Sequence, residues 1–190
     1  MNFLEDLPIV REFSKFERSW QGQKNFSLKA PTGSGKSIGL PWVLLKNNLV
    51  NGRIIVVQPR RIAAVSLARK LSDLINSELG MEVGYHIRFD KRCSETTKVV
   101  YVTDGILFRL LCSKQSLSKI GLIIFDEFHE RTLQMDASLA LAKSIQIEKE
   151  TDVRIIITSA TLDLKKICSY LGDCTPLEIT GRVFPVEVLY

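Results

Sequence analysis

The sequence predicts an α/β domain in which helices cover both faces of a mostly parallel sheet. Short apolar runs of strand length alternate with longer helical runs along the chain, which is typical of βαβ units with right-handed crossovers. A glycine-rich loop also joins the first strand-like run to the first long helical run. At 190 residues and 45% hydrophobic content, the chain suits one domain with a full core.

Residues 1–20 are expected to form one or two amphipathic helices, with apolar side chains available to pack on the sheet at Leu4, Leu7, Ile9, Val10, Phe13 and Phe16. The predicted strands are residues 26–29, 53–58, 98–103, 120–125, 153–158 and 176–179. The predicted helices are residues 36–47, 61–76, 105–113, 135–146 and 163–171.

The glycine-rich loop reads Ala-Pro-Thr-Gly-Ser-Gly-Lys-Ser over residues 30–37, with Ala30 in place of the usual first glycine. Its glycines allow a tight turn whose N–H groups surround phosphate oxygens, Lys36 can reach the β- and γ-phosphates, and the Ser37 hydroxyl can bind Mg²⁺. A plain glycine-rich turn is the alternative. The predicted nucleotide-binding residues of this P-loop are Thr32, Gly33, Ser34, Gly35, Lys36 and Ser37. The P-loop indicates a RecA-like domain.

An acidic pair, Asp126 and Glu127, directly follows the apolar run 122–125. The carboxyl ends of such strands are where open α/β sheets bind ligands. Asp126 is placed to hold Mg²⁺, usually through water, and Glu127 to orient and deprotonate the attacking water. A solvated acidic loop is the alternative for this segment alone, but an upstream P-loop favours the nucleotide site.

Five segments occur in the order of motifs I, Ia, Ib, II and III of superfamily 2 DEAH/RHA helicases, which they resemble. They are residues 30–37, 58–64, 102–107, 126–130 and 158–161. Phe128 replaces the alanine of Asp-Glu-Ala-His. This replacement, the Ala-Pro-Thr-Gly start of the P-loop, Leu40-Pro41 and the closing segment 181–186 are most similar to the bacterial HrpB-type helicases. The resemblance extends from about residue 7 to residue 190.

The resemblance implies an ATP-binding motor domain that uses ATP and Mg²⁺ to move along or unwind nucleic acid, with RNA favoured over DNA. It divides the chain into an N-terminal helical segment (1–20), a RecA-like domain (21–182) and the start of the passage to a second RecA-like domain (183–190). In this family the second domain supplies arginine fingers. Such a finger is worth about 10³–10⁵ in turnover, so this fragment alone is expected to hydrolyse ATP slowly or undetectably.

The resemblance also assigns roles outside the nucleotide site. Nucleic-acid contacts fall on Arg60, Arg88, Thr103 and Gly105; coupling between the nucleotide and the nucleic acid falls on Ser159 and Thr161, with His129 sensing the γ-phosphate. The alternatives are surface arginines paired with acids, and a helix N-cap formed by the Ser-Ala-Thr segment. Arg60 is favoured over Arg61, and a helix cap is favoured for Asp104.

The adenine contact is the weakest part of the resemblance. Relatives with this motif set often stack the base on an arginine of the helix after motif Ia, and the matching position here is Lys70. Because lysine stacks less well than a planar guanidinium, we expect poor selectivity for the base.

Composition bears on the partner, the location and the cysteine chemistry of the protein. The net charge of +5 and the pI near 9.1 agree with a polyanionic partner. No run is apolar enough for a signal peptide or a membrane span, so a cytoplasmic location is expected. The cysteines (Cys93, Cys112, Cys168 and Cys174) lack paired C-x-x-C spacing, so reduced thiols and no zinc site are expected.

Three other functions remain as alternatives. A double-stranded DNA translocase shares the P-loop and the acidic pair, but the Arg-Arg-Ile-Ala-Ala and Phe-His-Glu details disfavour it. A nucleotide-gated binding module would bind ATP without useful turnover, and the presence of Glu127 disfavours it for a full protein. A small-molecule P-loop kinase needs neither the Asp-Glu-x-His segment nor Ser-Ala-Thr and is the least favoured.

Overall fold

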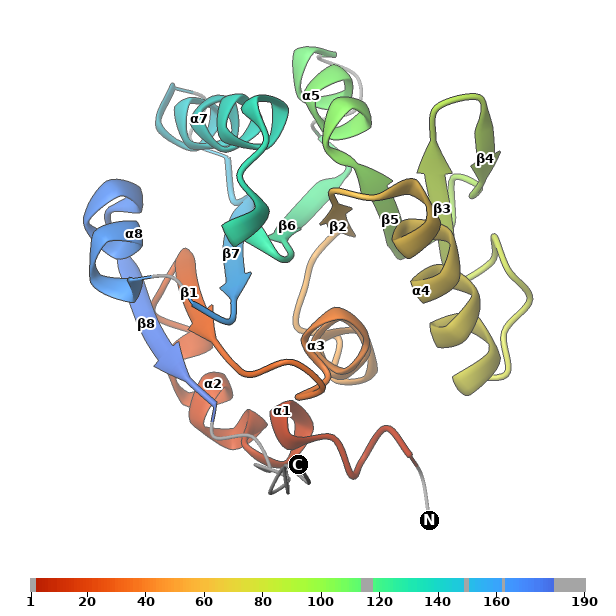
Figure 1. The fold of residues 1–190 in the computed structure, drawn as a ribbon, viewed down its shortest axis with the longest axis horizontal. Helices are drawn as coiled ribbons and strands as arrows, with labels where there is room; N and C mark the ends of the chain where they lie inside the picture. The colour runs from red at the N-terminus through yellow and green to blue at the C-terminus, as the bar shows by residue number, and fades with distance from the viewer. Residues whose placement is uncertain (1–2, 114–117, 149–150, 162, 180–190) are drawn as a thin grey trace, which may run out of the picture.

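An eight-stranded sheet forms the centre of the molecule, and helices cover both of its faces (Figure 1). The computed structural model describes residues 3–113, 118–148, 151–161 and 163–179. The segments 181–186 and 183–190 of the sequence analysis lie outside the described residues. Within the described residues, the predicted fold class is confirmed.

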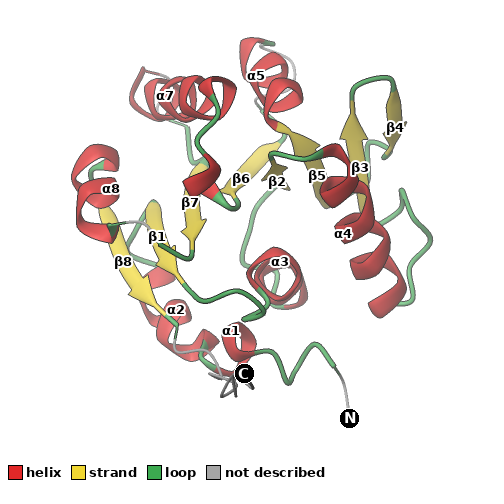
Figure 2. Cartoon of the chain, in the orientation of Figure 1, coloured by secondary structure: helices red, strands yellow, loops and turns green. Residues whose placement is uncertain are grey.

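The described elements, coloured by type in Figure 2, begin at Pro8. The strands are β1 (Asn25–Lys29), β2 (Arg53–Gln58), β3 (Val83–Ile87), β4 (Asp90–Arg92), β5 (Val99–Thr103), β6 (Ile120–Phe125), β7 (Arg154–Ser159) and β8 (Cys174–Glu178). The helices are α1 (Pro8–Arg11), α2 (Phe13–Trp20), α3 (Lys36–Lys46), α4 (Arg61–Leu74), α5 (Asp104–Cys112), the 3₁₀ helix η1 (Phe128–Glu130), α7 (Leu133–Glu148) and α8 (Leu164–Leu171).

The strand order is β4-β3-β5-β2-β6-β7-β1-β8, and every pairing is parallel except the β3–β4 hairpin. The predicted strands and helices are confirmed, with ends that differ by a few residues. Strands β3 and β4 were not among the predicted strands. The three residues of β4 are charged and exposed, so no apolar run marks that strand.

Two apolar cores lie on opposite faces of the sheet. One is formed with α1 to α4 and the other with α5, α7 and α8. The N-terminal segment belongs to the first core, where Phe16 of α2 packs against Trp20 and against Phe26 of β1, with ring centroids 5.2 and 4.7 Å away. The expected packing of this segment on the sheet is therefore confirmed.

Cys168 and Cys174 form a disulfide with their Cα atoms 4.9 Å apart, so the expectation of reduced thiols is wrong for this pair. The reversal at Gly172–Asp173 brings the last turn of α8 beside the start of β8, and a search for C-x-x-C spacing cannot detect that proximity. Cys93 and Cys112 are free thiols. Among the described residues, no group of three or more Cys, His, Asp or Glu side chains could hold a metal ion.

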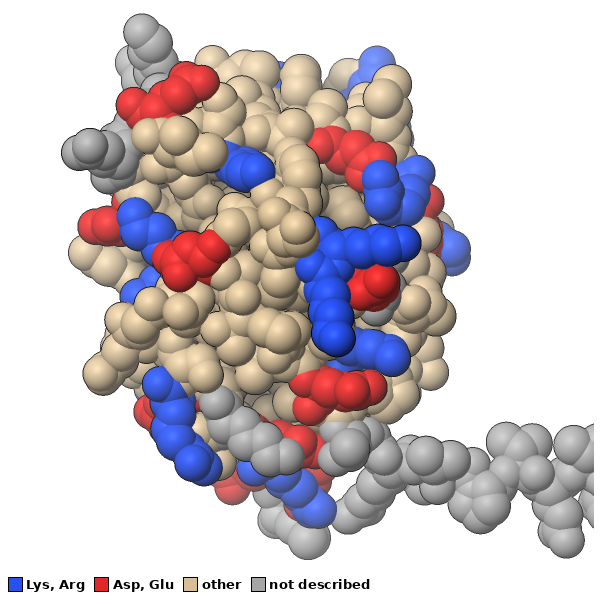
Figure 3. Space-filling model, turned by 90° about the vertical axis from the view of Figure 1, so that its left-hand side faces the viewer, with Lys and Arg blue, Asp and Glu red and all other residues tan. Residues whose placement is uncertain are grey.

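Charges of both signs are interspersed on the face that carries the β8 edge of the sheet (Figure 3). The net charge of +5 is therefore not gathered into a patch of one sign there. None of the helices in the described part of the chain combines the length and apolarity needed to cross a membrane.

Candidate functional site

The parallel strands bring the predicted motifs to one edge of the sheet, although they are far apart in the sequence. The P-loop follows β1, Ser159 ends β7, Asp126 follows β6, Gln58 ends β2 and Thr103 ends β5. These strands are neighbours in the order β1-β7-β6-β2-β5. The carboxyl ends of parallel strands form the ligand-binding edge of such sheets.

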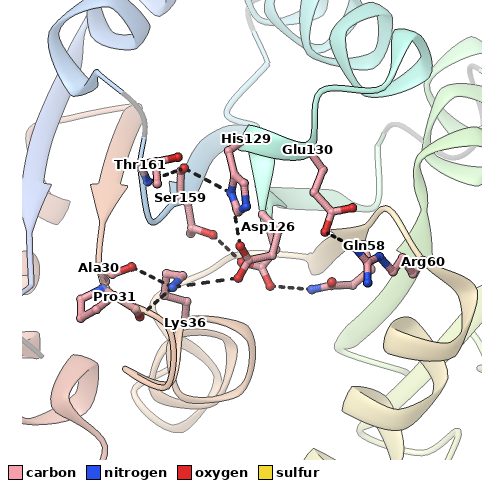
Figure 4. A network of polar contacts seen from close by, with 12 residues as sticks. Ala30, Pro31, Lys36, Gln58, Arg60, Asp126, His129, Glu130, Ser159 and Thr161 are labelled. Carbon is pink, nitrogen blue, oxygen red and sulfur yellow. Dashed lines mark hydrogen bonds and ion pairs between the residues drawn. The ribbon is translucent and has the colours of Figure 1, made fainter. Parts of the chain in front are cut away.

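The P-loop has the backbone that its glycines were expected to allow. Gly33 and Gly35 take φ values of 78° and 90°, and a Cβ at Gly35 would lie 2.9 Å from a side-chain atom of Leu7. Lys36 is buried, with 4% of its surface exposed. Its Nζ donates hydrogen bonds to the carbonyl oxygens of Ala30 and Pro31, both at 2.8 Å (Figure 4). The lysine is thus held inside the loop by main-chain oxygens.

Asp126 is fully buried and is held from both sides by neighbouring strands. Gln58 Nε2 donates to one carboxylate oxygen at 2.5 Å, and the Thr158 hydroxyl donates to the other at 2.5 Å. Because β2 and β7 are the two neighbours of β6, these contacts follow directly from the strand order. The carboxylate is therefore fixed in position before any ligand binds.

Glu127 lies between the P-loop and His129. Its backbone is left-handed (φ 50°), and its carboxylate lies 4.0 Å from Lys36 Nζ and 3.3 Å from His129 Nδ1. Burial raises the pKa of Glu127 above its ordinary value, the Asp126 charge raises it further, and Lys36 and His129 lower it. A carboxylate of raised pKa suits a group that accepts a proton from water.

The end of β7 contacts the acidic motif through Thr158, which donates to Asp126, and through Ser159. Ser159 Oγ lies 3.5 Å from His129 Nδ1 and accepts a hydrogen bond from the Thr161 backbone N–H at 3.2 Å. Through that N–H, Thr161 is linked to Ser159 of its own segment. The N-cap of α8 is Asp163, which accepts from the N–H groups of Lys165 and Lys166, so the alternative that Ser-Ala-Thr caps this helix is wrong.

A separate cavity of about 480 Å³ lies beyond β2, at the ends of β5 and β3. It gathers the predicted Arg88, Thr103 and Gly105, but Arg61 lines it and the predicted Arg60 does not. Arg60 instead forms an ion pair with Glu130, with Nη2 and Oε1 3.2 Å apart. The cavity is lined by Pro59, Arg61, Arg88, Thr103, Asp104, Gly105, Ile106, Arg109 and Gln134.

Asp104 begins α5 and stabilises the corner after β5. Its Oδ1 accepts a hydrogen bond from the Gly105 N–H at 2.7 Å, and its Oδ2 accepts one from the Thr132 hydroxyl at 2.6 Å. The N-cap role favoured for Asp104 is wrong: Thr103 is the N-cap of α5, and Asp104 is the first residue of the helix. At the adenine position, Lys70 Nζ lies 5.8 Å from the centre of the exposed Phe3 ring.

The sequence analysis missed several residues that build this edge. Gln58 and Thr158 hold Asp126, and the buried Tyr101 hydroxyl donates to the Ser37 carbonyl oxygen at 2.7 Å. Burial and the Asp126 charge raise the pKa of Tyr101 well above its ordinary value, so the hydroxyl stays a donor. A polar residue at the end of an apolar strand run is the signal that marks Gln58 and Thr158.

The residues present fit a nucleoside triphosphate with a divalent metal. The Ser34 hydroxyl in the P-loop is buried and lacks a hydrogen-bond partner within the described structure, as expected for a loop that awaits a ligand. Lys36 offers a cation, and Ser37 and Asp126 offer the hard oxygen ligands that Mg²⁺ prefers. A larger cavity of about 590 Å³, lined by Lys24, Asn51 and Arg154 among others, contains none of these residues.

Known ATP-dependent RNA helicases are similar to this chain over nearly its whole length. ATP-dependent RNA helicase HrpB of Escherichia coli (strain K12) is 42% identical over 187 residues, which are 98% of this chain and 23% of that protein. ATP-dependent RNA helicase dhx29 of Xenopus laevis is 36% identical over 201 residues, covering 100% of this chain and 15% of that protein. The chain thus spans less than a quarter of the length of these relatives.

A crystal structure of the Escherichia coli DEAH/RHA helicase HrpB has a similar fold. Its TM-score is 0.88 at 38% identity, over 96% of this chain and 23% of that one. The profile of the DEAD/DEAH box helicase family matches residues 15–169, which are most of the chain. The P-loop, the buried Asp126 and the polar strand ends therefore belong to a member of the DEAD/DEAH box helicase family.

Proposed function

We propose that this chain is the ATP-binding motor domain of a DEAH-type RNA helicase. The observation that carries the proposal is the meeting of two strand ends: Lys36 of the P-loop lies 4.0 Å from Glu127, beside a buried Asp126. A cation for phosphate, a carboxylate for metal and a carboxylate for water are thus held at one edge. The names of the relatives, ATP-dependent RNA helicases, support ATP and RNA as the ligands.

In this proposal each side chain has one task. Lys36 and the P-loop N–H groups bind the phosphates, while Ser37 and Asp126 hold Mg²⁺, which neutralises charge on the phosphates when bound. Glu127 orients water and accepts its proton, and His129 and Ser159 connect that carboxylate to β7. Such positioning and charge stabilisation supply most of the rate in phosphoryl transfer.

The nucleic acid is proposed to bind along the cavity of about 480 Å³, called the arginine cavity because Arg61, Arg88 and Arg109 line it. Arg61, Arg88 and Arg109 are exposed there, beside Thr103 and the Gly105 backbone, and cations with small polar groups suit a phosphodiester backbone. The exposed Phe89 ring lies 4.7 Å from the Arg88 guanidinium, so an aromatic face is available next to this cation. The domain division, the second RecA-like domain with its arginine fingers and the cytoplasmic location are parts of the same proposal.

Nucleotide binding tests the phosphate assignment directly. Replacing Lys36 with Ala should weaken the binding of a fluorescent ATP analogue with Mg²⁺ by about tenfold to a hundredfold, because charge-assisted hydrogen bonds are lost. Lys46→Ala is the matched control, since Lys46 is an exposed lysine in the last turn of the same helix. Equal affinities of the two variants would overturn the assignment.

The choice among functions needs a protein that carries both RecA-like domains. Its ATPase rate should rise with single-stranded RNA, and Glu127→Gln should abolish the rise. Stimulation by DNA alone would instead favour the translocase. A flat rate that Glu127→Gln does not change would leave a nucleotide-gated binding module.

A further inference from the structure

Figure 4 shows the Arg60–Glu130 ion pair beside Gln58, the residue that donates a hydrogen bond to Asp126. Arg60 follows β2 and precedes α4, while Glu130 ends η1 after β6, the strand next to β2. Pro59 and Arg61, the neighbours of Arg60 in the sequence, both line the arginine cavity. The pair therefore joins the corner nearest the cavity to the turn that carries Glu127.

The two partners differ in exposure. The Arg60 side chain is 74% exposed, whereas that of Glu130 is 30% exposed. A guanidinium presents several N–H donors in a planar fork, so solvent or an anion can reach those that Glu130 does not use. The charge of Arg60, however, is already balanced by a carboxylate, which lowers its attraction for a phosphate group.

The same turn connects Glu130 to the proposed base. The Glu130 N–H donates to the Glu127 carbonyl oxygen at 3.0 Å, so the two residues share one hydrogen-bonded turn. A second contact between the same two segments, Gln58 to Asp126, is buried and neutral on the Gln58 side. Of these two contacts between the β2 and β6 ends, only the Arg60–Glu130 pair is open to competition by a ligand.

We propose that Glu130 is a gate for nucleic acid: it competes with a strand phosphate for Arg60, and release of Glu130 signals strand binding to the turn that holds Glu127. This inference rests on the proposed function. In the free protein the ion pair weakens binding of the strand. When a phosphodiester takes the guanidinium, Glu130 loses its ion-pair partner, and the turn that Glu130 shares with Glu127 is no longer tied to Arg60.

Binding of a labelled single-stranded RNA dodecamer, followed by fluorescence anisotropy at several salt concentrations, tests the gate on this chain. Glu130→Gln should bind about two- to fivefold more tightly than the wild type, the range of an exposed ion pair. Because Arg60 then neutralises one more phosphate, the slope of log K against log salt should steepen by about one charge. A purely structural role of Glu130 would leave that slope unchanged.

Two further variants separate the gate from a general loss of negative charge. Glu95→Gln removes the acid of another surface pair, with Lys119 at 3.3 Å, and should leave the affinity near that of the wild type. In an Arg60→Gln background, Glu130→Gln should have no effect, because the pair no longer exists. If Glu130→Gln tightens binding equally in both backgrounds, or no more than Glu95→Gln does, the gate is wrong.

The failure of the gate is distinguishable from the failure of the proposed function. Loss of affinity in Arg61→Ala and Arg88→Ala would support the cavity whatever Glu130 does. If these two variants bind RNA as the wild type does, or if the wild type binds none, the nucleic-acid assignment fails and the gate fails with it. Thermal unfolding checks the fold of each variant, and Glu130→Asp, which keeps the charge on a shorter side chain, replaces Glu130→Gln if that variant is unfolded.

Discussion

The proposed nucleotide site and the arginine cavity lie at the same edge of the sheet, but they hold their charged groups in opposite ways. On the nucleotide side, Lys36 and Asp126 are buried and are held by hydrogen bonds from the P-loop and the adjacent strands. On the other side, Arg60, Arg61 and Arg88 are exposed. The first site holds its charged groups by hydrogen bonds, and the second presents charge on long, exposed side chains.

The difference follows from what each side is proposed to bind. A metal and a reacting phosphate need groups in defined positions, because positioning and prearranged charge provide the rate. A strand that is bound and released repeatedly needs contacts that form and break easily, and exposed arginines meet that requirement. Each prediction below tests one side of this comparison, from the largest expected effect to the smallest.

The largest effect is expected at Glu127. In a protein with both RecA-like domains, Glu127→Gln should lower the RNA-stimulated ATPase rate by about 10²–10⁴-fold, because the group that accepts the proton is lost. Affinity for the ATP analogue should remain within a fewfold of the wild type, since glutamine keeps the shape of the side chain. A rate that stays near the wild-type value would remove Glu127 from the reaction.

The hydrogen bond from Thr158 to the buried Asp126 should contribute to the stability of the fold. Thr158→Val removes a hydroxyl that donates to a fully buried carboxylate, and it should lower the free energy of unfolding by about 1–3 kcal/mol. Urea denaturation measures this change. The same substitution at Thr175, on the edge strand β8, is the control and should cost less. Equal costs would mean that Asp126 is not held as tightly as its contacts indicate.

Substitutions of the arginines that line the arginine cavity should have small and additive effects on the affinity for RNA. Arg61→Ala and Arg88→Ala should each weaken binding of single-stranded RNA by a fewfold and reduce the salt slope by about one. Arg18→Ala, at an exposed arginine of α2 away from the cavity, serves as the control. A loss of all binding on one substitution would show that a single arginine is essential for RNA binding, and would contradict additive contacts.

The smallest effect is a dependence of stability on pH. The folded pKa of Glu127 is raised above its unfolded value, so the folded state binds the proton more strongly. Stability from this group is therefore present at low pH and falls as the pH rises from the unfolded pKa through the folded one. Glu127→Gln removes this loss.

Thermal unfolding at acidic and neutral pH checks the sign of this effect. Glu127→Gln should be more stable than the wild type at neutral pH, by on the order of 1 kcal/mol or less, and the gap should close below the unfolded pKa. A gap that is unchanged with pH would mean that titration of Glu127 is not its cause.

Much of the fold was predictable because its signals are contiguous in the sequence. The apolar run before Asp126 predicts β6, and the glycines at positions 33 and 35 predict the tight loop before α3. Strand β4 and the disulfide of Cys168 were not predictable in this way. The first has no apolar pattern, and the second depends on a chain reversal.

The candidate site was predictable only in its parts. Lys36, Glu127 and Asp126 stand in recognisable motifs, and the structure brings them together. Their supports, Gln58 and Thr158, lie far from Asp126 in the sequence and meet it only because β2 and β7 flank β6. Arg61 was ranked below Arg60 and Arg109 was missed, since the sequence of a helix does not reveal which cavity an arginine lines.

The sequence by itself determined the α/β class, the phosphate loop, the acidic pair and the family resemblance, because each is written in a run of neighbouring residues with its own chemistry. Only the tertiary structure decided the spatial order of the motifs. Along the chain the motifs are in the order I, Ia, Ib, II and III. Along the sheet their order is I, III, II, Ia and Ib, at the ends of β1, β7, β6, β2 and β5. Strand pairing joins residues that are distant in the chain, so the proposed path from the nucleotide site to the arginine cavity, with the Arg60–Glu130 pair on it, exists only in the folded sheet.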